Sequence, residues 1–211
     1  MSGFLGVVGA SVFLALSPHN QSELTACGVD ADALNTYLEM DQHSFDQDFK
    51  GGWREVSERE GCGVGAAVLI ESYILFSKPS PAQKHGILRW HAGQILANEG
   101  ETARALAFFQ GTYQPEDDGA KSDWDLYVDA TIAFLDNDHS TLSNARDVLA
   151  TRLPDEETIA ARQKFLDDNP EITMPEGFVT EPQNLTVVNR LLDCFGKPYG
   201  DAYGDCEDSG N

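Results

Sequence analysis

Residues 87–115 (ILRWHAGQILANEGETARALAFFQGTYQP) constrain the fold more than any other segment of the chain. Apolar residues recur at helical spacing on both sides of Glu99-Gly100-Glu101, which predicts two amphipathic helices joined by a short turn. Such a pair cannot bury its apolar faces by itself, so it requires neighbouring helices. We therefore predict an all-α protein built from antiparallel helical hairpins.

Four positions of this segment resemble a tetratricopeptide repeat (TPR) in register. They are the small residue of the first helix, the turn glycine, and the small and aromatic residues of the second helix: Gly93, Gly100, Ala105 and Phe109. Gly93 and Ala105 lack bulk where two helix backbones must approach, and Phe109 fills the space beside them. The resemblance implies hairpins stacked in a TPR-like α–α superhelix.

Helical spacing also predicts a second hairpin from residues 122–135 and 140–150, with alanines at the same separation as Gly93 and Ala105. The other predicted helices are residues 30–40, 44–60, 64–76, 155–168 and 185–195. Glu71 is the one acidic residue inside the apolar helix 64–76. It either meets water, pairs with an arginine, or acts as an acid or base with a shifted pKa.

A pair of glycines, Gly51 and Gly52, precedes Trp53 inside the predicted helix 44–60. Each glycine costs a helix about 1 kcal/mol relative to alanine, so another interaction must compensate. We expect a close approach of another backbone segment or a kink that turns Trp53 inward. A ligand contact at this place is the alternative.

Residues 1–17 are apolar and uncharged, with the length of the apolar region of an export signal but without the basic residues that normally precede it. An apolar N-terminal core helix and a membrane anchor are the alternatives, although the stretch is too short to cross a bilayer as a helix. We expect a single helical domain over residues 18–203. Residues 204–211 are expected to form a disordered acidic tail.

Cysteine placement also favours export. Cys27 lies just before the first of two adjacent predicted helices and Cys62 just after the second, so in an antiparallel pair they meet at the same end. We predict a Cys27–Cys62 disulfide and hence a periplasmic or secreted protein. Two unpaired buried thiols in a cytoplasmic protein are the alternative. Cys194 and Cys206 flank a turn-rich stretch and form a second candidate pair.

The charge balance limits the partners of this chain. Its 14 basic and 35 acidic side chains give a net charge of −21, and the carboxylates are spread along the whole sequence. Such a surface repels phosphate backbones and anionic lipids, so we expect neither nucleic acid nor lipid headgroups as direct partners, and no stable membrane insertion. The charge is compatible with a basic protein partner, a saline habitat, or solubility alone.

Motifs for catalysis or cofactor binding are missing from the sequence. It contains no G-x-S-x-G elbow, Walker loop, dinucleotide glycine motif or H-E-x-x-H, and no cysteine and histidine spacing typical of zinc. We therefore name no catalytic residue, metal ligand or cofactor. Among the five histidines His91, beside Trp90, is the best placed for a function, and a packed or surface histidine is its alternative.

We expect an exported scaffold that binds a protein or peptide through a TPR-like groove lined by the first helix of each hairpin. The predicted binding residues are Arg89, Trp90, Gln94, Asp125, Tyr127 and Asp129. Two other functions stay open. One is an acidic inhibitor or immunity-type protein that covers a basic partner, and the other is an enzyme with a buried carboxylate in a helical cleft.

Asp129 is the residue we single out for such a carboxylate, because apolar residues surround it in its helix. A partly desolvated ion needs a donor, and we expect Arg89, the Trp90 indole or a backbone amide to supply it. Its role is either structural or that of a ligand-binding group in a cleft.

Overall fold

The computed structural model describes residues 12–78, 85–114, 121–174, 177–204 and 206. All regular secondary structure in these ranges is helical, which confirms the all-α prediction. The helices cluster into two compact units, unit 1 (residues 1–112) and unit 2 (residues 113–211). We predicted a single domain over residues 18–203. That requires the two units to associate with each other, so it stays a prediction. No described helix has both the length and the apolar character needed to cross a membrane.

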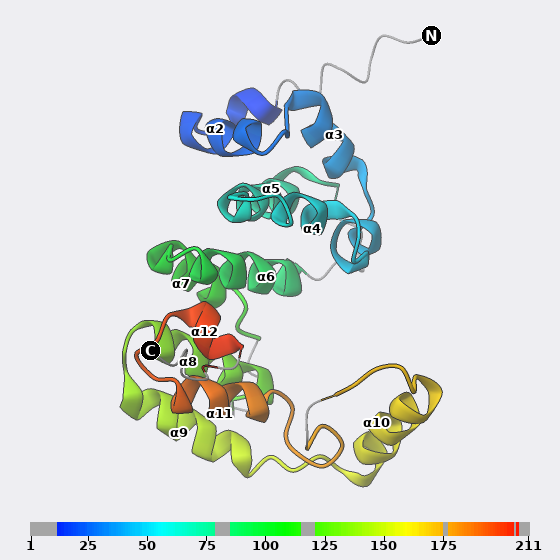
Figure 1. Cartoon of the computed structure of the whole chain (residues 1–211), viewed down its shortest axis with the longest axis vertical. Coiled ribbons are helices and arrows are strands. Elements are labelled where there is room, and N and C mark those ends of the chain that lie inside the picture. The colour runs from blue at the N-terminus through cyan, green and yellow to red at the C-terminus, as the bar shows by residue number, and fades with distance from the viewer. Residues whose placement is uncertain (1–11, 79–84, 115–120, 175–176, 205, 207–211) are drawn as a thin grey trace. The chain divides into compact units, whose positions relative to one another are not determined.

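Unit 1 consists of helix pairs in successive layers, α2 with α3, α4 with α5, and α6 with α7 (Figure 1). Its elements are α2 (Pro18–Ala26), α3 (Ala31–Glu39), the π-helical segment η1 (His43–Gln47), α4 (Gly52–Ser57), α5 (Gly63–Phe76), α6 (His85–Asn98) and α7 (Thr102–Gln110). α5 packs against α2, α3, α4 and α6. An apolar surface almost all round suits this central position, because a helix covered on several sides must bury several faces.

The prediction of one continuous helix over residues 44–60 is wrong. The chain forms η1, breaks, and restarts as α4 at Gly52. Gly52 has φ +58°, and a Cβ atom there would lie 1.9 Å from the backbone oxygen of Phe45. This contact confirms the expected close approach of another backbone segment, and Trp53, the next residue, is buried.

The α6–α7 pair packs as the glycine and alanine positions predict. A Cβ atom on Gly93 would lie 2.7 Å from the ring of Phe109, and Ala105 is fully buried. Gly100, in the turn between the helices, has φ +77°, a conformation that favours glycine. The local packing of one hairpin is therefore confirmed.

Both predicted cysteine pairs lie at disulfide distance. The Cα atoms of Cys27 and Cys62 are 5.6 Å apart, and those of Cys194 and Cys206 are 6.0 Å apart. Cys27 ends α2 and Cys62 begins α5, so their bond joins two layers of unit 1. Arg59 donates a hydrogen bond to the carbonyl oxygen of Cys27 and holds the same corner.

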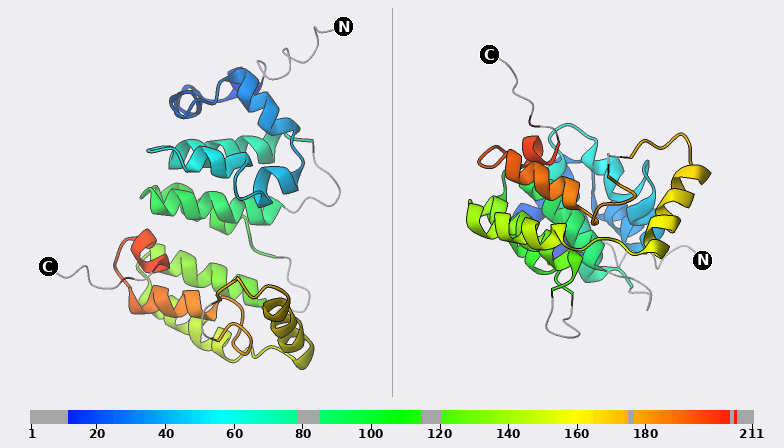
Figure 2. Two further views of the ribbon diagram at one scale, coloured as in Figure 1. Left: turned by 45° about the vertical axis from the view of Figure 1, so that its right-hand side comes forward. Right: turned by 90° about the horizontal axis from the view of Figure 1, so that it is seen from below.

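Unit 2 contains a compact group of helices and one helix that lies apart from it. Its elements are α8 (Asp123–Leu135), α9 (His139–Ala150), α10 (Glu156–Asp168), α11 (Leu185–Asp193) and α12 (Tyr199–Tyr203). α8 and α9 form the predicted second hairpin, α11 packs against both, and α12 packs against α11. α10 stands away from this group in each view (Figure 2), and none of its residues is buried.

The Gly52 contact yields a stability prediction. Gly52→Ala should lower the free energy of unfolding by about 2–5 kcal/mol, because overpacking costs about 1–3 kcal/mol and a non-glycine residue in the left-handed conformation costs about 1–2 kcal/mol. Gly61→Ala is the matched control, since Gly61 has φ +72° but nothing within 4 Å of the added Cβ. Urea unfolding of both variants measures the difference, and equal losses would contradict the Phe45 contact.

Candidate functional site

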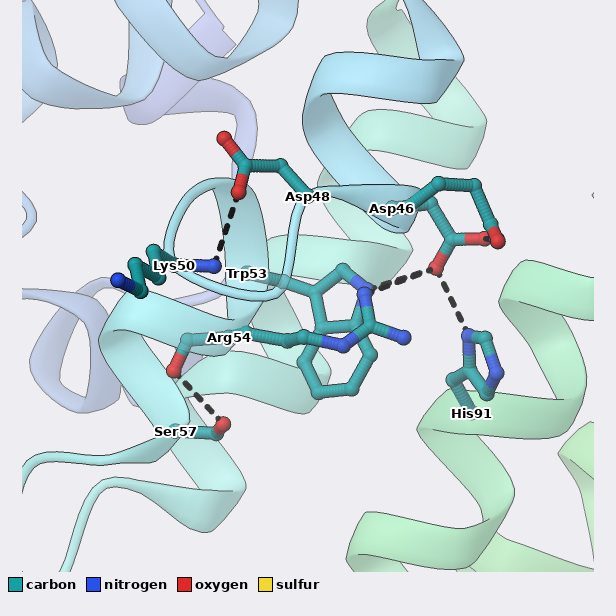
Figure 3. A network of polar contacts seen from close by, with 8 residues as sticks. Asp46, Asp48, Lys50, Trp53, Arg54, Ser57 and His91 are labelled. Atoms are coloured by element: carbon teal, nitrogen blue, oxygen red, sulfur yellow. Dashed lines mark hydrogen bonds and ion pairs between the residues drawn. The ribbon is translucent and has the colours of Figure 1, made fainter. Parts of the chain in front are cut away.

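A buried carboxylate lies at the junction of η1, α4 and α6. The side chain of Asp46 has no exposed surface. Its Oδ1 atom accepts hydrogen bonds from Trp53 Nε1 and His91 Nδ1, each 2.8 Å long, and its Oδ2 atom accepts one of 2.6 Å from Gln47 Nε2 (Figure 3). Three donors from three elements therefore converge on one carboxylate.

These donors decide the charge of Asp46. Burial by itself would raise the pKa of the carboxyl group, but the hydrogen bonds from His91 and Trp53 outweigh it, and the net pKa lies below the usual value. The Arg54 guanidinium adds a positive charge, with Nη1 3.8 Å from Asp46 Oδ1. Asp46 is thus an ionised, compensated carboxylate at neutral pH.

Arg54 is held by aromatic rings. Its guanidinium carbon lies 4.2 Å from the ring centre of Trp53 and 5.6 Å from that of Phe49. The Nη1 atom is buried and makes no hydrogen bond to the described part of the chain. Arg54 Nη1 therefore interacts with Asp46 through charge alone and does not donate a hydrogen bond to it.

The geometry supports a structural role for this network. His91 presents Nδ1 to the carboxylate, which assigns the proton to Nδ1 and leaves Nε2 as the nitrogen able to accept a proton. An acid or base also needs access to a substrate, and Asp46 is fully buried. The network links α6 to η1 and α4, and it supports packing more directly than chemistry.

Only part of this network is marked in the sequence. His91 was singled out as the best placed histidine, whereas Asp46 is one of many carboxylates in an acidic chain. Trp53 and His91, the two donors to its Oδ1 atom, lie 7 and 45 residues away along the sequence, so no local pattern marks Asp46 as the centre of a network.

The predicted binding residues of unit 1 fall in different environments of α6. Trp90 is buried and packs on Phe109 with ring centres 4.6 Å apart. Gln94 is half-buried. Arg89 lines a recess of about 190 Å³ formed by α5, α6 and α7. Of these three side chains, the recess brings only Arg89 into a candidate site.

The predicted residues of unit 2 make internal contacts. Asp125 is buried and accepts a hydrogen bond of 2.9 Å from the Gln114 backbone N–H. Tyr127 is buried, and its hydroxyl lies 3.1 Å from that of Tyr203. Burial and the nearby Tyr203 raise the pKa of the Tyr127 phenol, which stays protonated.

Asp129 is paired within unit 2 by two donors that the sequence analysis does not name, a tyrosine hydroxyl and a lysine ammonium group. The Tyr113 hydroxyl donates a bond of 2.8 Å to Oδ1, and Lys121 Nζ donates one of 2.5 Å to Oδ2. A groove that joins the predicted residues of both units stays a prediction, because Arg89, Trp90 and Gln94 belong to one unit and the aspartates and Tyr127 to the other.

Two further recesses flank the loop that follows α10. One of about 380 Å³ is lined by Arg162, Phe178, Glu181 and Val187, among others. The other, of about 460 Å³, includes Leu166, Ile172, Phe178 and Val179. Among the described residues, none of these three recesses is lined by two carboxylates, the arrangement that would favour an enzyme.

Metal binding gains no support from the described ranges, in which no three histidine, cysteine or acidic side chains are grouped to hold an ion. Comparisons with protein-family models, with curated proteins and with solved structures find no match for this chain.

The Asp46 network predicts a large effect of one substitution. Asp46→Asn should destabilise the protein by about 3–5 kcal/mol, because the amide removes the charge that faces Arg54 and directs N–H groups toward other donors. Chemical denaturation at pH 7 measures the loss. Asp48→Asn is the control, since Asp48 is exposed and asparagine retains its acceptor for the Lys50 N–H.

The pH dependence provides a second readout of the same substitution. A carboxyl pKa that is lowered by folding stabilises the protein above the unfolded pKa of about 4, and this contribution is lost as the pH falls through the folded pKa. The stability difference between the parent and Asp46→Asn should therefore shrink below pH 4. A difference that stays constant from pH 7 down to pH 2 would show that folding does not lower the pKa of Asp46.

Proposed function

We propose that this chain is an exported helical scaffold that binds a protein or peptide segment carrying apolar and basic side chains. The observation that carries the proposal is that α10 buries none of its residues yet has apolar side chains. An amphipathic helix is usually stabilised by burial of its apolar face. A helix with so little burial has apolar surface left to contact a partner.

The surface concerned, here named the α10 surface, consists of Phe165, Leu166, Ile172 and Phe178. Phe165 is 40% exposed and Ile172 is 39% exposed. Phe178 lies beside Phe165, with ring centres 6.3 Å apart. Single exposed apolar residues are common on proteins, but a group around a recess favours an interaction site.

Charge specifies the partner. Residues 155–171 contain six acidic and two basic side chains. Arg162 is turned toward the backbone, where Nη1 donates to the carbonyl oxygens of Phe178 and Glu181, and Lys164 is paired with Asp168. The remaining carboxylates leave a negative rim, which favours basic side chains around an apolar centre.

The TPR-like superhelix is part of this proposal. Its support is the hairpin packing of α6 and α7, where Gly93 and Phe109 are in close contact. Export is proposed as well, because two cysteine pairs at disulfide distance are typical of oxidising compartments.

The location proposal predicts the state of the cysteines. Non-reducing peptide mapping of the natively produced protein should recover the Cys27–Cys62 crosslink. Replacing both cysteines by alanine should lower the free energy of unfolding by about 3–4 kcal/mol, given the 35-residue separation of the pair. Free thiols at both positions in the native protein would remove the support for export.

Partner binding is tested by substitution in the α10 surface. Phe165→Ser should abolish capture and chemical crosslinking of the partner by the purified chain, while the melting temperature changes little because the side chain is already partly exposed. Phe49→Ser is the matched control, since Phe49 is 80% exposed and belongs to unit 1. Equal partner recovery with both variants would exclude the α10 surface.

The salt dependence of partner binding distinguishes this proposal from the alternative of an acidic inhibitor. Binding that depends on the apolar centre should persist at 0.5 M salt, where the Debye length is reduced to about 4 Å. An inhibitor that covers a basic surface mainly by charge should dissociate under the same condition.

A further inference from the structure

The recess beside Arg89 has the composition of a small-molecule site. It lies between α5, α6 and α7 in unit 1 and has a volume of about 190 Å³. Its lining residues are Glu71, Ile74, Leu75, Arg89, Ala107 and Phe108. Ile74 and Phe108 are half-buried, and Leu75 is 62% exposed. Apolar walls with a few polar groups are typical of ligand pockets.

The two charged residues of the recess are unpaired. Neither Glu71 nor Arg89 forms a hydrogen bond or ion pair with the residues that the structure describes, and they do not form an ion pair with each other. Other cations of this acidic chain do hold carboxylates, as Lys121 does with Asp129 and Lys164 with Asp168. Arg89 is thus available to a ligand.

Gly111 helps to place the Arg89 side chain. A Cβ atom on Gly111 would lie 3.2 Å from Arg89 Cδ and 3.5 Å from Nη1. Because Gly111 has no side chain, the Arg89 side chain can pack against the backbone at the end of α7. The position of the guanidinium depends on packing, without any ion pair to hold it.

We infer that this recess binds a free apolar α-amino acid as its zwitterion. The Arg89 guanidinium binds the carboxylate, for which its planar pair of N–H donors is suited. The Glu71 carboxylate binds the ammonium group. The ligand side chain packs on Ile74, Leu75 and Phe108.

Size and charge define this ligand class. A volume of about 190 Å³ is below the roughly 300–1,000 Å³ of pockets for drug-sized molecules, so the ligand is small. One acidic and one basic group in the same recess match a molecule that carries both charges. An internal peptide segment has neither terminal charge, which distinguishes this site from the α10 surface.

The ligand series tests the inference on the unaltered chain. Leucine, leucine amide and N-acetyl-leucine are titrated by saturation-transfer NMR and calorimetry. Leucine should bind, and each capped compound, which lacks one charge, should bind roughly tenfold more weakly or worse. Failure of leucine and of the other apolar amino acids to bind, or equal affinity for leucine and both capped compounds, would overturn the proposal.

Variants assign the two contacts. Glu71→Gln should weaken leucine binding and remove the preference over N-acetyl-leucine, while Arg89→Gln should remove the preference over leucine amide. Arg104→Gln, a charge change on α7 outside the recess, should leave both preferences intact. Circular dichroism confirms that each variant is folded. Unchanged leucine affinity in both recess variants would contradict the assignment.

The amino-acid site and the α10 surface can be tested independently of each other. Loss of amino-acid binding in Arg89→Gln should not affect partner capture through the α10 surface, and Phe165→Ser should leave leucine binding unchanged. Each site therefore has its own readout.

Discussion

Unit 1 depends on the hydrogen bonds that Asp46 accepts in its interior. An ionised carboxylate with no exposed surface is costly to bury unless donors and positive charge compensate it. Trp53, His91 and Gln47 provide the donors, and Arg54 provides a nearby charge. Because these groups come from η1, α4 and α6, the network also determines how successive helix pairs meet. The kink at Gly52 belongs to the same arrangement, since it turns Trp53 toward Asp46.

The two units differ in how completely their helices are buried. α5 is covered by four other helices, whereas α10 buries no residue. Local stability follows burial, so α10 should open more easily than the helices of unit 1. Such a helix is suited to binding a partner, because its apolar side chains are accessible without unfolding the core. The recess beside Arg89 is different, since its walls belong to packed helices of unit 1 that hold its charged groups in place.

Most helices could be predicted from the sequence, and the exceptions have physical reasons. The helix over residues 44–60 was interrupted because Gly52 adopts a positive φ against the Phe45 carbonyl, a contact that periodicity does not report. α2 is not marked by helical periodicity, because its residues are mostly polar and only Leu24 is buried, so its signals are the Ser17 cap and Pro18 at its start. α12 was missed because it is a single short helix in a segment rich in glycine and acidic residues.

The sequence by itself determined what depends on neighbouring residues: the helical period, the Gly93 and Ala105 positions of the α6–α7 pair, and cysteines placed at helix ends. Tertiary structure decided what depends on distant residues. Asp46 became the centre of unit 1 because His91 lies beside it, 45 residues along the chain. Asp129 acquired Tyr113 and Lys121 as partners, while Arg89 was left unpaired near Glu71. Charge and polarity are encoded locally, but the donor that reaches a carboxylate is selected by the packing of whole helices.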